Sequence, residues 1–70
     1  MNRIASWIMK CIKKKKQMSE VAVIKYVLNN LPSMKREDIQ KTIEELLDKE
    51  YIIRKEGNHE ILLYNTYHVC

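Results

Sequence analysis

The chain has 70 residues, of which 46% are hydrophobic, and it contains one Gly and one Pro. This length permits one small domain, and this composition indicates a folded, helix-rich chain rather than a disordered one. So short a chain has little material to enclose a deep active site, so we expect that it is not an enzyme and that it holds no cofactor.

The net charge of +4 is unevenly distributed along the chain. Residues 1–16 contain six basic side chains and no acidic one, whereas the remainder contains seven basic and nine acidic side chains. This asymmetry indicates that the N-terminal segment faces an acidic partner, which could be a protein surface, nucleic acid or a membrane. No apolar run approaches the roughly 18 residues that a membrane span needs, so we expect no membrane span.

Residues 3–14 are predicted to form a helix, because apolar side chains recur with helical spacing at Ile4, Trp7, Ile8, Cys11 and Ile12. Asn2 could cap its start. Lys10 and Lys13 fall well away from the apolar face, whereas Lys15 would return to it. We therefore expect residues 1–16 to form a basic N-terminal helix and arm, with the helix ending near Lys14 and residues 15–18 acting as a connection.

A second helix is predicted over residues 19–31. Ser19 is a suitable N-cap, and Glu20 would lie at the positive end of the helix dipole. The short run of residues 21–24 is also compatible with a strand, but the longer helical period and the stop at Pro32 favour a helix. Its expected apolar positions are Val21, Ile24, Val27, Leu28 and Leu31.

A third helix over residues 36–50 is the clearest element. Its apolar stripe consists of Ile39, Ile43, Leu46 and Leu47, and Glu37 and Asp38 occupy its first turn. In residues 51–64 the helical spacing of apolar residues stops, and two short runs rich in β-branched, aromatic and aliphatic residues follow. These runs are expected to form a hairpin around a turn at 56–59, followed by a tail over residues 65–70. Three helices followed by a two-stranded wing predict one mainly helical winged helix-turn-helix domain.

Winged helices often bind DNA through the third helix, which lies in the major groove. Here residues 36–50 contain three basic and six acidic side chains, so phosphate repulsion would oppose that insertion. A nucleic-acid binder that uses the basic N-terminal arm is therefore kept as the alternative function.

The remaining candidate residues show few groupings that would form a metal site or a catalytic site. Cys11 and Cys70 have no metal-ligand spacing, and the default compartment is a reducing, intracellular one. His59 and His68 are expected at the surface, and Trp7 and the four methionines are expected to fill the core or an interface. Lys13 to Lys16 are expected to form either a basic docking patch or a solubilising loop.

Two separated stretches resemble the C-terminal winged-helix domain of the cullin family. The first is residues 38–54, DIQKTIEELLDKEYIIR, and the second is Ile8-Met9-Lys10 followed by the basic pair Lys13-Lys14. Residues 19–31 also resemble the intervening helix of that domain. The resemblance extends from Ile8 to about Tyr64.

Cullins are scaffolds of multi-subunit RING ubiquitin ligases. The resemblance implies that Lys10 accepts a ubiquitin-like modifier, a modification called neddylation, through an isopeptide bond. Partner docking would fall to Met9, Lys13, Lys14, Lys15 and Lys16. The implied partners are a RING-box subunit, the modifier and its conjugating enzyme, and the implied localisation is cytoplasmic and nuclear.

Where the family usually has an aliphatic pair and an arginine before this lysine, the chain has Ala5-Ser6-Trp7. A purely structural interaction module with an unmodified Lys10 therefore stays open as a third interpretation.

Overall fold

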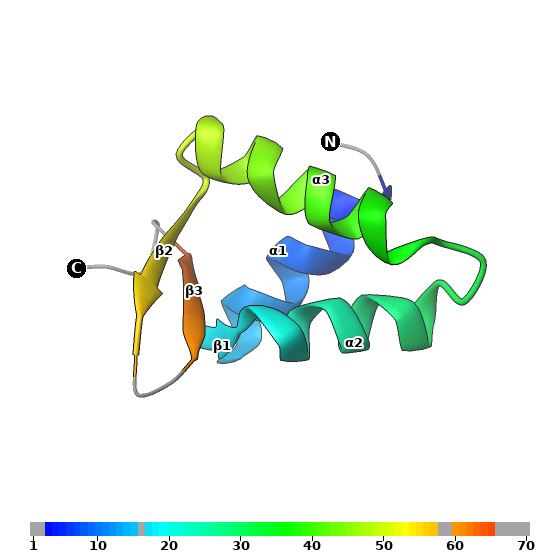
Figure 1. Cartoon of the computed structure of the whole chain (residues 1–70), viewed down its shortest axis with the longest axis horizontal. Helices are drawn as coiled ribbons and strands as arrows, with labels where there is room; N and C mark the ends of the chain where they lie inside the picture. The colour runs from blue at the N-terminus through cyan, green and yellow to red at the C-terminus, as the bar shows by residue number, and fades with distance from the viewer. Residues whose placement is uncertain (1–2, 16, 58–59, 66–70) are drawn as a thin grey trace.

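Three helices pack around a common core and against a small antiparallel sheet (Figure 1). The computed structural model describes residues 3–15, 17–57 and 60–65. The elements are α1 (Arg3–Lys15), β1 (Gln17–Ser19), α2 (Glu20–Asn30), α3 (Arg36–Asp48), β2 (Ile52–Glu56) and β3 (Ile61–Asn65). The prediction of a mainly helical, winged-helix-like fold is confirmed.

The wing has three strands, so the prediction of a two-stranded wing is wrong. The strand order is β1-β3-β2, with both neighbours of β3 antiparallel to it. The first two residues of β1, Gln17 and Met18, lie in the segment expected to be a connection, and its last residue, Ser19, was expected to begin the second helix. β1 pairs with β3 from Gln17 opposite Tyr64 to Ser19 opposite Leu62. A strand of three residues is too short for an alternating pattern, so pairing with β3 determines its conformation.

α1 places its apolar residues against the core as expected, and its buried positions are Ala5, Ile8, Cys11 and Ile12. It continues one residue beyond the expected end, to Lys15, whose side chain is exposed. Three lysines in its last turn complement the negative end of the helix dipole. The thiol of Cys11 lies against the thioether sulfur of Met18, which joins α1 to β1. Asn2 lies outside the described residues.

α2 begins directly after β1 because Ser19 caps it. The Ser19 Oγ accepts a hydrogen bond from the Ala22 N–H at 3.2 Å, as the sequence predicts. The buried residues of this helix are Val23, Ile24 and Val27. Val21 was expected on the buried face, but 55% of it is exposed. Val23 takes a core position instead, and the first turn of α2 lies beside the wing (Figure 1).

α3 ends at Asp48, two residues before the expected end. Glu50 has a positive φ of 63°, and the Tyr51 N–H donates to the Leu46 carbonyl at 3.0 Å. The Glu50 N–H donates to the Leu47 carbonyl at 3.1 Å, which completes a Schellman motif. This left-handed residue turns the chain from α3 into β2.

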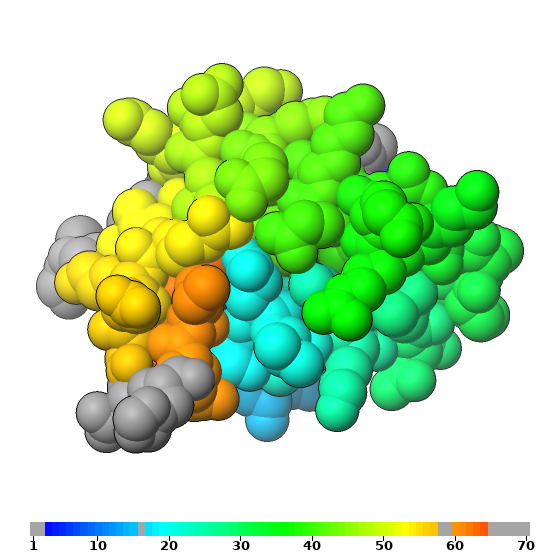
Figure 2. Space-filling view, in the orientation of Figure 1, coloured from blue at the N-terminus to red at the C-terminus, as the bar shows by residue number. Residues whose placement is uncertain are grey.

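One core joins all of these elements. Its largest fully buried side chains come from every helix and from both long strands of the wing: Ile8, Ile12, Val23, Val27, Ile39, Ile43, Ile52 and Leu63. The space-filling view shows α2, α3 and the wing meeting on one face, with little of α1 visible between them (Figure 2). Among the described residues, no helix is both long and apolar enough to cross a membrane.

Candidate functional site

Lys10 lies on the side of α1 that faces away from the core. Its neighbours Ile8, Cys11 and Ile12 are buried, whereas Lys10 itself is exposed. No carboxylate among the described residues lies within ion-pair distance of its amine. The amine is thus reachable from solvent and has no anionic partner in the described part of the chain.

The Lys10 ammonium is not free of contacts, because it packs on an aromatic ring. Its Nζ lies 5.1 Å from the centre of the Trp7 ring, three residues earlier on the same helix. A cation in this position over an indole is attracted by about 0.5–1 kcal/mol at an exposed site. Trp7 also packs edge-on against Tyr26 of α2, with ring centres 5.9 Å apart and an interplanar angle of 61°. Tyr26 therefore helps to fix the ring on which the amine lies.

Four residues of α1 line a shallow hollow around this contact, with a volume of about 410 Å³. They are Arg3, Ser6, Trp7 and Lys10. The spacing of three and four residues places them on one side of the helix. We call this surface the Lys10 hollow. It presents two cations, one aromatic face and one hydroxyl group.

The other predicted docking residues are less uniform. Lys13, Lys14 and Lys15 are exposed in the last turn of α1, and Lys16 lies outside the described residues. Met9 is half-buried and packs against the core, so only part of its side chain is accessible to a partner. The three lysines and the Lys10 hollow make α1 the basic element of the described chain.

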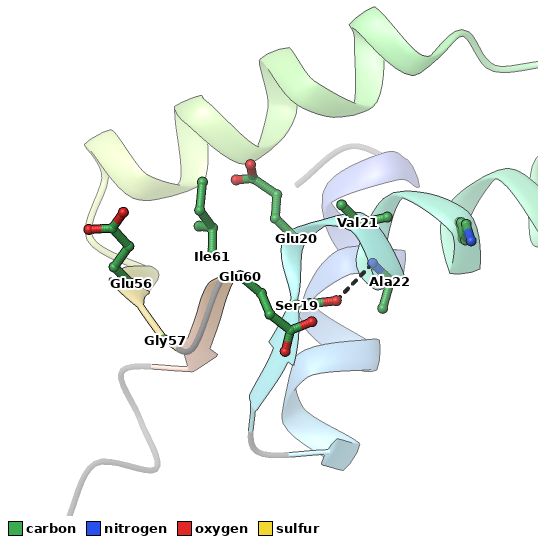
Figure 3. A pocket seen from close by; sticks show the side chains of 9 residues that line it. Ser19, Glu20, Val21, Ala22, Glu56, Gly57, Glu60 and Ile61 are labelled. Atoms are coloured by element: carbon green, nitrogen blue, oxygen red, sulfur yellow. Dashed lines mark hydrogen bonds between the residues drawn. The ribbon is translucent and has the colours of Figure 1, made fainter.

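A second concave surface lies between the N-terminal turn of α2 and the wing (Figure 3). Its volume is about 970 Å³. Val21 and Ile61 contribute to its lining and are the exposed large hydrophobic residues of the described chain, with 55% and 41% of their surface accessible. Ser19 and Ala22, which are joined by the capping hydrogen bond, also line it, and Glu56 and Glu60 bring negative charge from the wing. Sequence reasoning missed this groove because it assigned Val21 to the core.

Arg54 joins three elements through one ion-pair cluster. Its Nη2 lies 2.6 Å from the Glu20 Oε1 of α2 and 2.6 Å from the Glu44 Oε1 of α3, and its Nε also donates to Glu20 at 3.2 Å. The hydrogen bond from Arg54 lowers the pKa of Glu44 below its ordinary value. The hydrogen bonds to Glu44 and Glu20 in turn raise the pKa of Arg54. This cluster links the wing to both helices.

No family model and no curated protein matches this chain. The function proposed below therefore depends on the sequence resemblance described above and on the geometry of the chain's own residues.

The described residues offer little for metal or thiol chemistry. They contain no group of three or more His, Cys, Asp or Glu side chains placed to hold a metal ion. Cys11 is buried, and burial raises the pKa of its thiol, an effect that the nearby Lys15 charge partly opposes. The reactive thiolate is thereby disfavoured. His59, His68 and Cys70 lie outside the described residues. What remains is an exposed amine on a basic helix.

Proposed function

We propose that this chain is the C-terminal winged-helix domain of a cullin-type scaffold of a multi-subunit RING ubiquitin ligase. In this role it is a substrate of modification rather than an enzyme. Lys10 accepts a ubiquitin-like modifier, and the modified scaffold becomes active in ubiquitin transfer. Its site of action is the cytoplasm and nucleus. The proposal is supported by the resemblance of residues 8–64 to that domain and by the winged-helix-like fold.

The observation that carries the proposal is the exposure of the Lys10 amine. It projects from the face of α1 opposite Ile8 and Ile12, with no described carboxylate bound to it. An enzyme carrying an activated acyl group can approach an amine placed in this way. An amine buried in the core or held by a carboxylate would have to break those contacts first.

The chemical step is an acyl transfer. The Lys10 Nζ attacks the thioester carbonyl that joins the modifier's C-terminus to a cysteine of the conjugating enzyme. A carbon–nitrogen bond forms, the carbon–sulfur bond breaks, and the cysteine leaves as a thiolate. The attacking nitrogen loses one further proton as the amide forms, and this proton passes to the departing thiolate or to water. The ammonium must first lose a proton, and the conjugating enzyme's site supplies the base and the environment for this. Leaving the Trp7 ring adds a cost of about 0.5–1 kcal/mol.

The basic end of α1 supports docking of an acidic partner. Lys13, Lys14 and Lys15 lie one turn beyond Lys10 and are exposed. Their positive charge favours the approach of an acidic conjugating enzyme or RING-box surface and increases its association rate. They therefore serve docking, whereas Lys10 serves as acceptor.

Nucleic-acid binding is the alternative function, and α3 disfavours it. Between Arg36 and Asp48 this helix has two basic and five acidic side chains. Its N-terminal turn, which would approach a phosphate backbone, contains Glu37 and Asp38. A DNA complex would have to rely mainly on the lysines of α1, and its affinity would fall steeply with salt concentration.

A discharge assay tests the proposal. The chain is mixed with a conjugating enzyme charged with the modifier, in the presence of a RING-box subunit, and products are mapped by peptide mass spectrometry. We expect an isopeptide at Lys10, its loss in Lys10→Arg, and its retention in the control Lys41→Arg, which changes an exposed lysine of α3. Arginine keeps the positive charge but is not a usable nucleophile at neutral pH. Modification distributed over several lysines, and unaffected by Lys10→Arg, would refute the assignment.

A further inference from the structure

Ser6 shares the Lys10 hollow with two cations. It is exposed on α1, three residues after Arg3 and four residues before Lys10. In a helix, side chains at these separations are neighbours on the same side. The Ser6 hydroxyl is therefore placed between a guanidinium and an ammonium, next to the Trp7 ring.

None of the described residues that line the hollow carries a negative charge to balance these cations. No described carboxylate pairs with Arg3 or Lys10. The first turn of α1 contains no acidic residue, whereas α2 has Glu20 there and α3 has Glu37 and Asp38. A negative group added near this helix N-terminus would gain from both the cations and the dipole.

We propose that Ser6 is a phosphorylation site and that its phosphate binds the Lys10 ammonium and withholds it from acylation. The consequence for conjugation rests on the proposed function of Lys10, whereas the phosphorylation and its effect on the amine do not. The modifying enzyme would be a protein kinase that recognises its target serine through an arginine three residues before it.

The modification is an ordinary phosphoryl transfer. The Ser6 Oγ attacks the γ-phosphorus of a nucleoside triphosphate bound to a protein kinase. A new oxygen–phosphorus bond forms, the bond from the γ-phosphorus to the β–γ bridging oxygen breaks, and the nucleoside diphosphate leaves. The hydroxyl proton passes to the kinase's base. Arg3 would enter an acidic subsite of the kinase, as arginine pairs well with carboxylates.

Kinase access requires the first turns of α1 to open, because Ala5 is packed into the core. Openings at helix ends are the least costly local unfolding events in a protein.

Ser19 also follows lysines in the sequence, but its Oγ already accepts the Ala22 N–H as the cap of α2. Of these two serines, Ser6 is the one whose hydroxyl lies in the cationic hollow.

The phosphate would change the state of Lys10 directly. It carries a charge of about −1.5 to −2 at neutral pH and offers three acceptor oxygens. One helical turn separates it from Lys10, which is the spacing of a favourable ion pair. The ammonium would leave the Trp7 ring for the phosphate. This ion pair would stabilise the protonated form of Lys10, and only the deprotonated amine has a lone pair that can attack a carbonyl.

Two measurements on the full chain test this proposal. In the first, the chain is incubated with ATP and the cyclic-AMP-dependent protein kinase, which selects arginine before its target serine, and phosphate is mapped by mass spectrometry. We expect phosphate at Ser6, its absence in Ser6→Ala, and a rate reduced by about tenfold or more in Arg3→Ala, where the charge-assisted contact is lost. Ser33, with Asn30 three residues before it, is the internal control. An unmodified Ser6 would overturn the proposal.

In the second measurement, a chain made by peptide ligation with phosphoserine at position 6 is treated with a limiting amount of an acetyl N-hydroxysuccinimide ester. Acylation at Lys10 should fall roughly fivefold relative to Lys14 in the same molecule, the size expected for a favourable exposed ion pair. An unchanged ratio would overturn the proposal.

Because this reagent needs no conjugating enzyme, the second result does not depend on whether Lys10 is the natural acceptor. The ratio of acylation at Lys10 to that at Lys14 could fall as expected while a conjugating enzyme that carries the modifier does not modify Lys10 in the unphosphorylated chain. In that case the proposed function fails, and the phosphate-dependent protection of the amine stands.

Discussion

The Lys10 amine lies on the ring of Trp7, with its Nζ 5.1 Å from the ring centre. Tyr26 of α2 packs against the same ring, so α1 and α2 together determine where the amine rests. The predicted acceptor therefore has a defined resting position on the protein surface.

Replacing Trp7 with leucine should release the Lys10 side chain. The indole ring current should shift the ε-methylene protons of Lys10 upfield, because Nζ lies over the ring. This shift should disappear in Trp7→Leu because no aromatic face remains at that position. Proton–carbon correlation spectra measure it, with the exposed Lys13 in the same spectrum as the reference. Lys10 resonances that coincide with those of Lys13 in the unmodified chain would contradict the contact.

Replacing Glu44 with glutamine should lower stability near neutral pH but not in acid. Arg54 hydrogen-bonds to Glu44 and depresses its pKa, so the folded state binds a proton less readily than the unfolded state. The stabilisation is complete above the ordinary value of 4.5 and is lost as pH falls through the lower, folded-state pKa.

Because half of the Glu44 side chain is exposed, we expect a loss of only about 0.5 kcal/mol at pH 7. This corresponds to a decrease in Tm of about 3 °C. Thermal unfolding followed by circular dichroism between pH 2 and 7 measures the difference. Glu45→Gln, at the next exposed position of α3, is the matched control. A difference that persists unchanged at the lowest pH would contradict the role of the Glu44 charge.

Glu50→Gly should be more stable than Glu50→Ala. Both variants remove the same carboxylate, but only glycine adopts the positive φ of this position without a steric cost. The expected difference in the free energy of unfolding is about 1 kcal/mol. Urea titration of the two variants measures it. Equal stabilities would mean that the backbone after α3 is not held in the left-handed region.

Cys11 should react slowly with thiol reagents while the chain is folded. Burial raises its pKa and restricts access to its sulfur, although the charge of Lys15 opposes the first effect. In a Cys70→Ser background, the rate of reaction with an aromatic disulfide should be at least about 100-fold lower in buffer than in urea, because reaction requires opening. Similar rates in both solvents would contradict the burial of Cys11.

The sequence predicts the long periodic elements well and the short ones poorly. The stripes of residues 3–15 and 36–48 repeat over several turns, so their helices and most of their buried faces were predicted correctly. β1 has three residues and depends on pairing with residues 62–64, which are distant in sequence. No local pattern identifies such a strand.

Two local features also escaped prediction for physical reasons. The chain's single glycine lies in the wing, so nothing in the sequence identifies Glu50 as the left-handed residue after α3. Trp7 was expected to fill the core or an interface, but its ring also receives the Lys10 ammonium. A tryptophan three residues before a lysine on a helix was the available signal for that contact.

The central claim is that one amine among the ten lysines of this chain accepts the modifier. Competition among the lysines of a single molecule tests it most directly. The unmodified chain is mixed with a RING-box subunit and a limiting amount of conjugating enzyme that carries the modifier as a thioester. Peptide mapping then determines which lysine carries an isopeptide. The account predicts that the first modifier added is found at Lys10. A first modifier found predominantly at Lys13, Lys14 or Lys15, with Lys10 unmodified, would contradict it.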